Sequence, residues 1–254
     1  MSTELKNKLM DYCLRLGDTS LILGHRLSEW CGHGPILEED IALQNISLDL
    51  YGQARLIYSY AGEAEGKKRD EDALAYHRDE REFRNLLITE QPNVDFAQTI
   101  LRQFLYSAYA FFFYQELKQS KDKTLSAFAE KSLKEVSYHL RHSGEWVIRL
   151  GDGTTESHER MVNAIGELWI YTGDIFEMDA VDEELIKAGI AVDLKKIFPL
   201  WENKVKEVFK EATLEIPQNV FMQHGSRKGI HTEHLGYILA EMQTLPRMYP
   251  EAKW

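Results

Sequence analysis

Four long blocks of the sequence carry apolar residues at helical spacing, and this pattern most restricts what the chain can fold into. The blocks cover about residues 3–30, 37–61, 94–119 and 125–150. None of them alternates with the two-residue period of a strand, so the sequence predicts an all-α fold. The second block is apolar almost all round, which predicts a helix that is buried on several sides.

The breaks between the blocks indicate how the helices connect. Gly-His-Gly-Pro at 32–35 ends the first helix, Gly62 ends the second, and Gly151-Asp152-Gly153 ends the fourth. A charged connection at 63–92 joins the second helix to the third, which Asn93 is expected to cap. Four helices with a long connection between the middle two are typical of a ferritin-like bundle.

Further helical patterns follow the bundle, at about residues 155–171, 182–188, 193–212 and 231–245. No stretch rich in Gly, Pro or Ser separates them from the bundle. The sequence therefore predicts one ferritin-like domain over 1–254, with a core bundle at about 3–150 and accessory C-terminal helices at about 151–254.

Charge and hydropathy exclude several function classes. The chain has 30 Lys+Arg against 41 Asp+Glu, a net charge of −11, and no concentrated basic surface. This balance argues against a nucleic-acid binder and against binding to an anionic membrane. No apolar run is long enough to span a membrane, and the N-terminus has no signal-peptide pattern. A cytoplasmic protein is expected.

A ferritin-like di-metal site needs a carboxylate from each of two helices and Glu-x-x-His from each of the other two. The third block has no Asp or Glu from Phe96 to Gln115, and the second has one interior acid, Asp49. Val136 stands at the carboxylate position before His139, and the first block offers Glu29. These oxygen ligands are too few to hold two irons.

The remaining polar residues suggest a metal-free alternative. They repeat at helical spacing on the second and fourth helices, so each set shares one face. If the two faces meet, the side chains can satisfy one another in a buried hydrogen-bonded network. The predicted members are Asn45, Asp49, Gln53, Glu135, His139 and His142.

Several long motifs resemble the C subunits (PaaC family) of bacterial phenylacetyl-CoA epoxidase, and the resemblance spans nearly the whole chain. The matching motifs are L-G-H-R-L-S-E-W-C-G-H-G-P from residue 23, R-D-E-R-E-F-R-N-L-L from 78, K-E-V-S-Y-H-L-R-H-S from 134 and H-T-E-H-L-G-Y-I-L-A-E-M from 231, with a tail that ends in Trp254.

The resemblance implies a role in a multicomponent mono-oxygenase that epoxidises the ring of phenylacetyl-CoA with O2 and electrons from a reductase. In that family the di-iron site belongs to the homologous A subunit, and the C subunit is a structural partner without iron. The implied partners are the A subunit, the B subunit and the reductase, and no cofactor is implied in this chain. A homodimer is an open alternative for the isolated chain.

Aligned with the A-subunit motifs, the resemblance places Leu50, Gln53 and Val136 at ligand positions, keeps His139, and matches Glu29 to the ligand of the first helix. The third-helix carboxylate falls near Ser107.

Two other interpretations remain open. One is a degenerate metal-binding oxygenase that acts on an aromatic acyl-CoA through Glu29, Asp49, Glu135 and His139. The other is a stand-alone homodimer that binds a small aromatic ligand in the remnant cavity. The aromatic residues at 104–113 could line a pocket for an aromatic acyl group, but they are interpreted as core or subunit interface. His231 and His234 are interpreted as part of a capped helix start.

Overall fold

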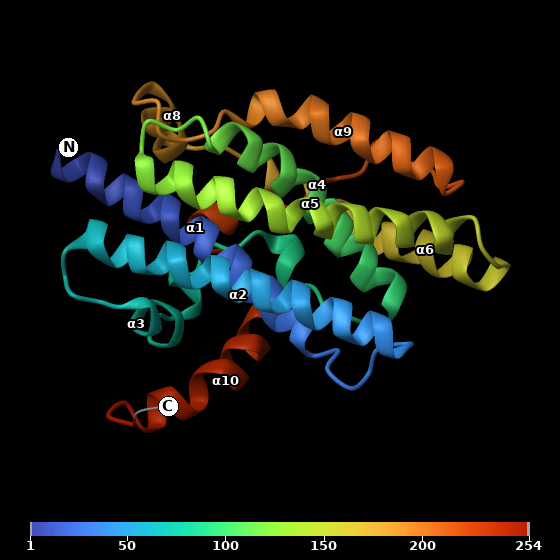
Figure 1. The fold of residues 1–254 in the computed structure, drawn as a ribbon, viewed down its shortest axis with the longest axis horizontal. Coiled ribbons are helices and arrows are strands. Elements are labelled where there is room, and N and C mark those ends of the chain that lie inside the picture. The colour runs from blue at the N-terminus through green and yellow to red at the C-terminus, as the bar shows by residue number, and fades with distance from the viewer. Residues whose placement is uncertain (1, 253–254) are drawn as a thin grey trace.

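Residues 2–252 are described by a computed structural model, and every regular element among them is a helix. The core consists of α1 (Thr3–Ser28), α2 (Leu37–Glu65), α4 (Phe96–Leu117) and α5 (Lys123–Gly151). In Figure 1, α1 pairs with α2, α4 pairs with α5, and α2 lies beside α5. The predicted all-α, ferritin-like bundle is confirmed. Trp254 lies outside the described residues.

The start of α4 differs from the prediction. Asp95 caps this helix, its carboxylate accepting the amide of Gln98 at 2.9 Å. Asn93 stands two residues earlier and donates instead to the carbonyl of Arg26 at 2.7 Å. Between the two, Val94 has a φ of 33°, which turns the chain into the helix. Asn and Asp cap helices about equally well, so residue type alone did not separate them.

The end of α2 also differs from the prediction. The helix continues to Glu65, and Gly66 ends it in the left-handed conformation with a φ of 72°. Gly62, the predicted stop, lies inside the helix. A Cβ at this position would collide with the carbonyl oxygen of Arg69, so glycine lets the connection pass close to α2.

One side of α2 is exposed, contrary to the prediction of a helix buried on several sides. Ile41, Leu48 and Leu56 are 51%, 65% and 46% exposed. They share one face of the helix with Gly52. A Cβ added at Gly52 would have no neighbouring atom within 4 Å, so the surface over this residue is open. We call these four residues the α2 stripe. Apolar side chains exposed in a row mark a surface suited to another protein chain.

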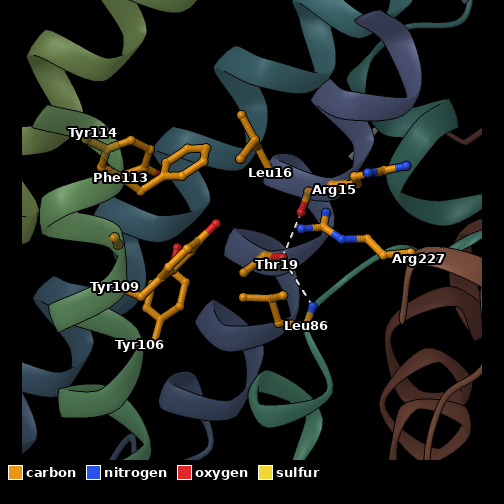
Figure 2. Close-up of a pocket in the computed structure, with 10 residues that line it drawn as sticks. Arg15, Leu16, Thr19, Leu86, Tyr106, Tyr109, Phe113, Tyr114 and Arg227 are labelled. Carbon is orange, nitrogen blue, oxygen red and sulfur yellow. Dashed lines mark hydrogen bonds between the residues drawn. The ribbon is translucent and has the colours of Figure 1, made fainter. Parts of the chain in front are cut away.

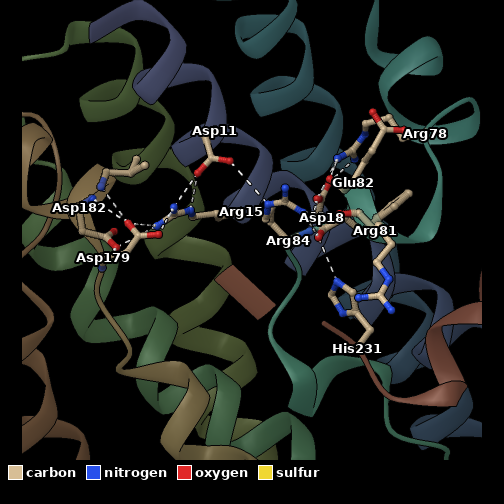
Figure 3. Close-up of polar contacts among 12 residues, drawn as sticks. Asp11, Arg15, Asp18, Arg78, Arg81, Glu82, Arg84, Asp179, Asp182 and His231 are labelled. Carbon is tan, nitrogen blue, oxygen red and sulfur yellow. Dashed lines mark hydrogen bonds and ion pairs between the residues drawn. The ribbon is translucent and has the colours of Figure 1, made fainter. Parts of the chain in front are cut away.

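The connection between α2 and α4 lies across α1 rather than in solvent. It contains α3 (Glu71–Tyr76), η1 (Glu80–Glu82) and η2 (Leu87–Glu90). Residues 77–84 are strongly charged, yet Arg78 is only 1% exposed and pairs with the fully buried Asp18 of α1. Figure 3 shows this pair beside Arg84, whose backbone amide also donates to Asp18, at 2.7 Å.

Accessory helices cover three sides of the bundle: α6 (Thr155–Leu168), η3 (Trp169–Tyr171), α7 (Thr172–Ile175), α8 (Ala180–Lys187), α9 (Leu194–Glu211), η4 (Ser226–Lys228) and α10 (Glu233–Met248). The helices α6 and α9 pack on α4 and α5, α8 packs on α1, and α10 packs on the connection. Arg15 attaches α8 to α1 through Asp179 and Asp182, at 2.7 and 2.9 Å (Figure 3).

The accessory helices lie within a few residues of their predicted positions, although the short α7 was not predicted. Between residues 2 and 252, no helix combines the length and the hydropathy that crossing a bilayer requires.

Candidate functional site

Polar side chains of α2 and α5 meet along a line that we call the α2–α5 seam. It consists of Glu39, Asp49 and Gln53 from α2 and Glu135, His139 and His142 from α5. Three hydrogen bonds of 2.8–2.9 Å cross the seam, and each joins one residue of α2 to one residue of α5. The helical spacing of the two sets brings these side chains to a shared boundary.

Gln53 is the most completely bonded residue of the seam. Its Nε2 donates to Glu135 Oε2 at 2.9 Å, and its Oε1 accepts the hydroxyl of Tyr114 from α4 at 3.2 Å. The residue is only 2% exposed. Gln53 therefore joins three helices of the bundle through a single amide group.

The imidazole of His139 is fully buried, and its Nε2 lies 2.9 Å from Asp49 Oδ2. The Asp49 side chain is 38% exposed, so water reaches this end of the pair. The other ring nitrogen, Nδ1, is buried without a hydrogen-bond partner among the described residues. This pair is therefore buried at its α5 end and partly open at its α2 end.

One predicted member of the network needs correction. Asn45, predicted to belong to the buried network, is exposed, and the described part of the chain gives its side chain no hydrogen bond. His142, which was also predicted, lies in the seam and bonds to Glu39, in the first turn of α2, at 2.8 Å. The sequence did not indicate that Glu39 belongs to the network, because this residue does not continue the four-residue spacing of Asp49 and Gln53.

The residues that the resemblance aligns with iron ligands do not fit a di-iron centre. Leu50 and Val136 are fully buried apolar residues at the ligand positions of α2 and α5. Ser107 is a buried residue of α4, which has no Asp or Glu from Phe96 to Gln115. Glu29 is engaged elsewhere, by Arg26 at 2.8 Å and Asn93 at 2.7 Å.

Metal ligation requires several donor atoms that converge on one point. Within residues 2–252, no group of three or more His, Cys, Asp or Glu side chains is arranged to hold a metal ion. In the seam, each carboxylate faces an amide or an imidazole from the opposite helix. Two hard metal ions would need bridging oxygens that this arrangement does not supply.

A small cavity lies between α1 and α4, and Figure 2 shows its lining. Tyr106, Tyr109 and Tyr114 of α4 face Thr19 of α1 across it, with Arg227 near one end. Its volume of about 20 Å³ holds one water molecule. A phenyl ring does not fit there, so the aromatic residues of α4 form core rather than a ligand pocket.

Burial raises the pKa of Tyr106, Tyr109 and Tyr114 above the usual value for a phenol. All three hydroxyls stay protonated at neutral pH and keep a hydrogen that they can donate. The hydroxyl of Tyr114 donates a hydrogen bond to Gln53 of the seam.

Comparison with known proteins connects this geometry to a family. The family model described as "Phenylacetic acid catabolic protein" matches residues 1–254. The chain belongs to the phenylacetic acid catabolic protein family. This family is ferritin-like, in agreement with the bundle of α1, α2, α4 and α5.

A curated member of the phenylacetic acid catabolic protein family is similar along its full length. This relative is the C subunit of the 1,2-phenylacetyl-CoA epoxidase of Escherichia coli (strain K12). It is 50% identical over 248 residues, which cover 98% of this chain and 100% of the relative. The resemblance inferred from the motifs is thereby confirmed.

Substituting Gln53 tests whether the seam stabilises the bundle. Gln53→Ala is expected to lower the free energy of unfolding by about 1–3 kcal/mol, because the Tyr114 hydroxyl loses its buried acceptor. Urea unfolding followed by circular dichroism measures the change. Asn45→Ala, on the same helix, is the control and should stay within about 0.5 kcal/mol of wild type. Equal effects of the two substitutions would show that the seam contributes nothing specific.

Proposed function

We propose that this chain is a non-catalytic structural subunit of a phenylacetyl-CoA epoxidase that acts in aerobic phenylacetate degradation. It pairs with the homologous di-iron A subunit and stabilises it. The observation that carries this proposal is the seam, where Leu50 and Val136 occupy ligand positions and the remaining polar groups bond to one another. The name of the similar Escherichia coli protein supports the assignment to the epoxidase.

This assignment determines which subunit of the epoxidase holds the cofactor. The chain itself holds no cofactor, and the di-iron centre resides in the A subunit. The B subunit and the reductase complete the set of partners, and the assembly works in the cytoplasm. This chain contributes a rigid bundle surface rather than reacting groups.

The α2 stripe is the proposed contact surface for the A subunit. Ile41, Leu48 and Leu56 offer apolar side chains along about four turns of one helix. Gly52 lies between Leu48 and Leu56, and the open space over it allows a side chain of a partner to approach the helix backbone. An obligate interface is rich in apolar residues of this kind.

Co-expression tests the proposed function. The A subunit is produced alone and together with this chain, and its soluble yield and its epoxidase activity with the reductase are measured. We expect low yield or activity alone and recovery of both when this chain is present. An A subunit that is fully soluble and active by itself would contradict the proposal.

A further inference from the structure

A buried histidine attaches the start of the C-terminal arm, which we define as residues 230–252, to the rest of the molecule. Further along the arm, Gln243 and Arg247 donate to backbone carbonyls of the α2–α4 connection. The His231 side chain has no exposed surface, and neither has that of Glu90 at the end of η2. His231 Nδ1 lies 2.9 Å from Glu90 Oε2, and Nε2 lies 3.0 Å from the carbonyl oxygen of Phe83. Figure 3 shows the ring below Asp18 and Arg84.

The partners of the ring determine its protonation state. A backbone carbonyl only accepts, so Nε2 carries a hydrogen toward Phe83. Glu90 accepts from two further donors, the amide of Thr232 at 2.6 Å and Asn85 Nδ2 at 2.8 Å, as an ionised carboxylate does. Nδ1 therefore donates to Glu90 as well. A ring with two N–H groups is an imidazolium, and its charge is balanced by Glu90.

The charged surroundings favour this state. Burial alone lowers the pKa of His231, but the hydrogen bond and the charge of Glu90 outweigh burial and raise the pKa above its usual value. The Phe83 carbonyl and the negative charge of Asp18 act in the same direction. The other charged or titratable groups near the pair are Arg26, Arg78, Arg84, Tyr171, Glu233 and His234.

The nearby arginines have partners of their own. Arg78 pairs with Asp18, and Arg26 pairs with Glu29 and donates to the Glu90 carbonyl. Arg84 Nη1 donates to the Phe83 carbonyl at 2.7 Å and therefore competes with His231 for that acceptor. Glu90 remains the one carboxylate that bonds directly to the ring among the described residues.

The segment just before the arm is attached separately from the histidine. The buried carboxylate of Asp174 accepts the amides of Gly225 and Ser226, each at 3.1 Å. Gly229 follows with a φ of 66°, and a Cβ there would collide with the Arg81 carbonyl. The attachment through Asp174 contains no histidine, so it does not change with protonation of His231.

We propose that the arm is a pH-sensitive element, docked on the α2–α4 connection while His231 is charged and released when His231 loses its proton. Deprotonation removes one of the two N–H donors, so that a ring nitrogen lone pair faces either the Glu90 carboxylate or the Phe83 carbonyl and that acceptor keeps one donor fewer. Leu235, Ile238 and Leu239 form the buried face of α10, and release exposes them to solvent or to another chain.

The sign of the pH dependence follows from the direction of the pKa shift. Because the pKa of His231 is raised in the docked state, its contribution to docking is complete below about pH 6.5, the ordinary value for histidine. The contribution falls as pH rises through the raised pKa. Between about pH 6.5 and the raised pKa, each pH unit increases the opening equilibrium by up to about tenfold, the limit for one proton, and above the raised pKa the equilibrium no longer changes.

Hydrogen exchange detected by mass spectrometry on the full chain tests the proposal between pH 6 and 9. Peptides from α10 should show an opening equilibrium, corrected for intrinsic exchange, that rises with pH in wild type. His231→Gln should open more at pH 6 and lose the pH dependence. His234→Gln, in the same arm, is the matched control and should behave as wild type.

An NMR titration of the His231 ring in the wild-type chain keeps the test independent of how any variant folds. The expected result is a doubly protonated ring at pH 7. A neutral ring at pH 7 would overturn the proposal, and so would α10 exchange without pH dependence in wild type. Neither measurement uses an epoxidase partner, so the outcome is separate from that of the proposed function.

Discussion

Asp18→Asn is expected to lower the free energy of unfolding by about 3–5 kcal/mol, since it leaves a buried arginine without its counter-charge. Asp18 is fully buried and accepts from both terminal nitrogens of Arg78. It also accepts from the hydroxyl of Tyr58 at 2.5 Å and the amide of Arg84 at 2.7 Å. An Asn side chain has one acceptor oxygen and would direct its NH2 group at some of these donors.

Chemical denaturation of the purified chain measures this loss. A double variant, Asp18→Asn with Arg78→Met, should be more stable than the sum of the two single effects predicts, because no buried charge remains unpaired. Glu207→Gln removes an exposed ion pair with Lys204 and should change stability by less than about 1 kcal/mol. If Asp18→Asn proved no more harmful than Glu207→Gln, the buried pair would not hold the connection on α1.

Leu48→Glu is expected to weaken binding to the A subunit by about tenfold to a hundredfold, because the proposed interface would bury a carboxylate without a partner. Leu48 is 65% exposed at the middle of the α2 stripe, so the substitution should leave the bundle itself folded. Titration of the A subunit with tagged wild-type or variant chain gives the dissociation constants.

Val162→Glu is the matched control for this titration. Val162 lies on α6 and is 48% exposed. Its substitution by Glu therefore places a carboxylate at an exposed apolar position on a different helix. It should bind as wild type does. Weaker binding by Val162→Glu together with normal binding by Leu48→Glu would move the interface away from α2.

Patterns of residues predicted the bundle well, because helical spacing and turn residues act locally. The four core helices and the accessory helices followed from the apolar period. The errors at Gly62 and Asn93 arose where two nearby residues suited the same role, and the path of the backbone decided between them. A carbonyl of the connection needs glycine at position 62, and Asp95 lies directly before α4.

The exposed side of α2 could not be distinguished from a buried one by sequence. A helix that is apolar all round is buried either within its own chain or against another chain, and the pattern is the same in both cases. The predicted seam placed Asp49, Gln53, Glu135 and His139 on faces that meet. It missed Glu39, which reaches His142 from the first turn of α2.

Buried ion pairs were the least predictable feature. Arg78 lies in a strongly charged stretch that is typical of a solvated surface, and Glu90 precedes a Gln-Pro turn. Each is buried because it pairs with a residue far away in sequence, Asp18 in one case and His231 in the other. A sequence without its fold does not reveal such pairs.

This chain is proposed to support an iron-containing partner without holding iron itself. The most direct measurement is the iron content of each chain, separated from a complex co-expressed with the A subunit in iron-rich medium. We predict about two irons per A subunit and none bound to this chain. Stoichiometric iron in this chain, with ligation that is lost in His139→Ala, would contradict the proposal.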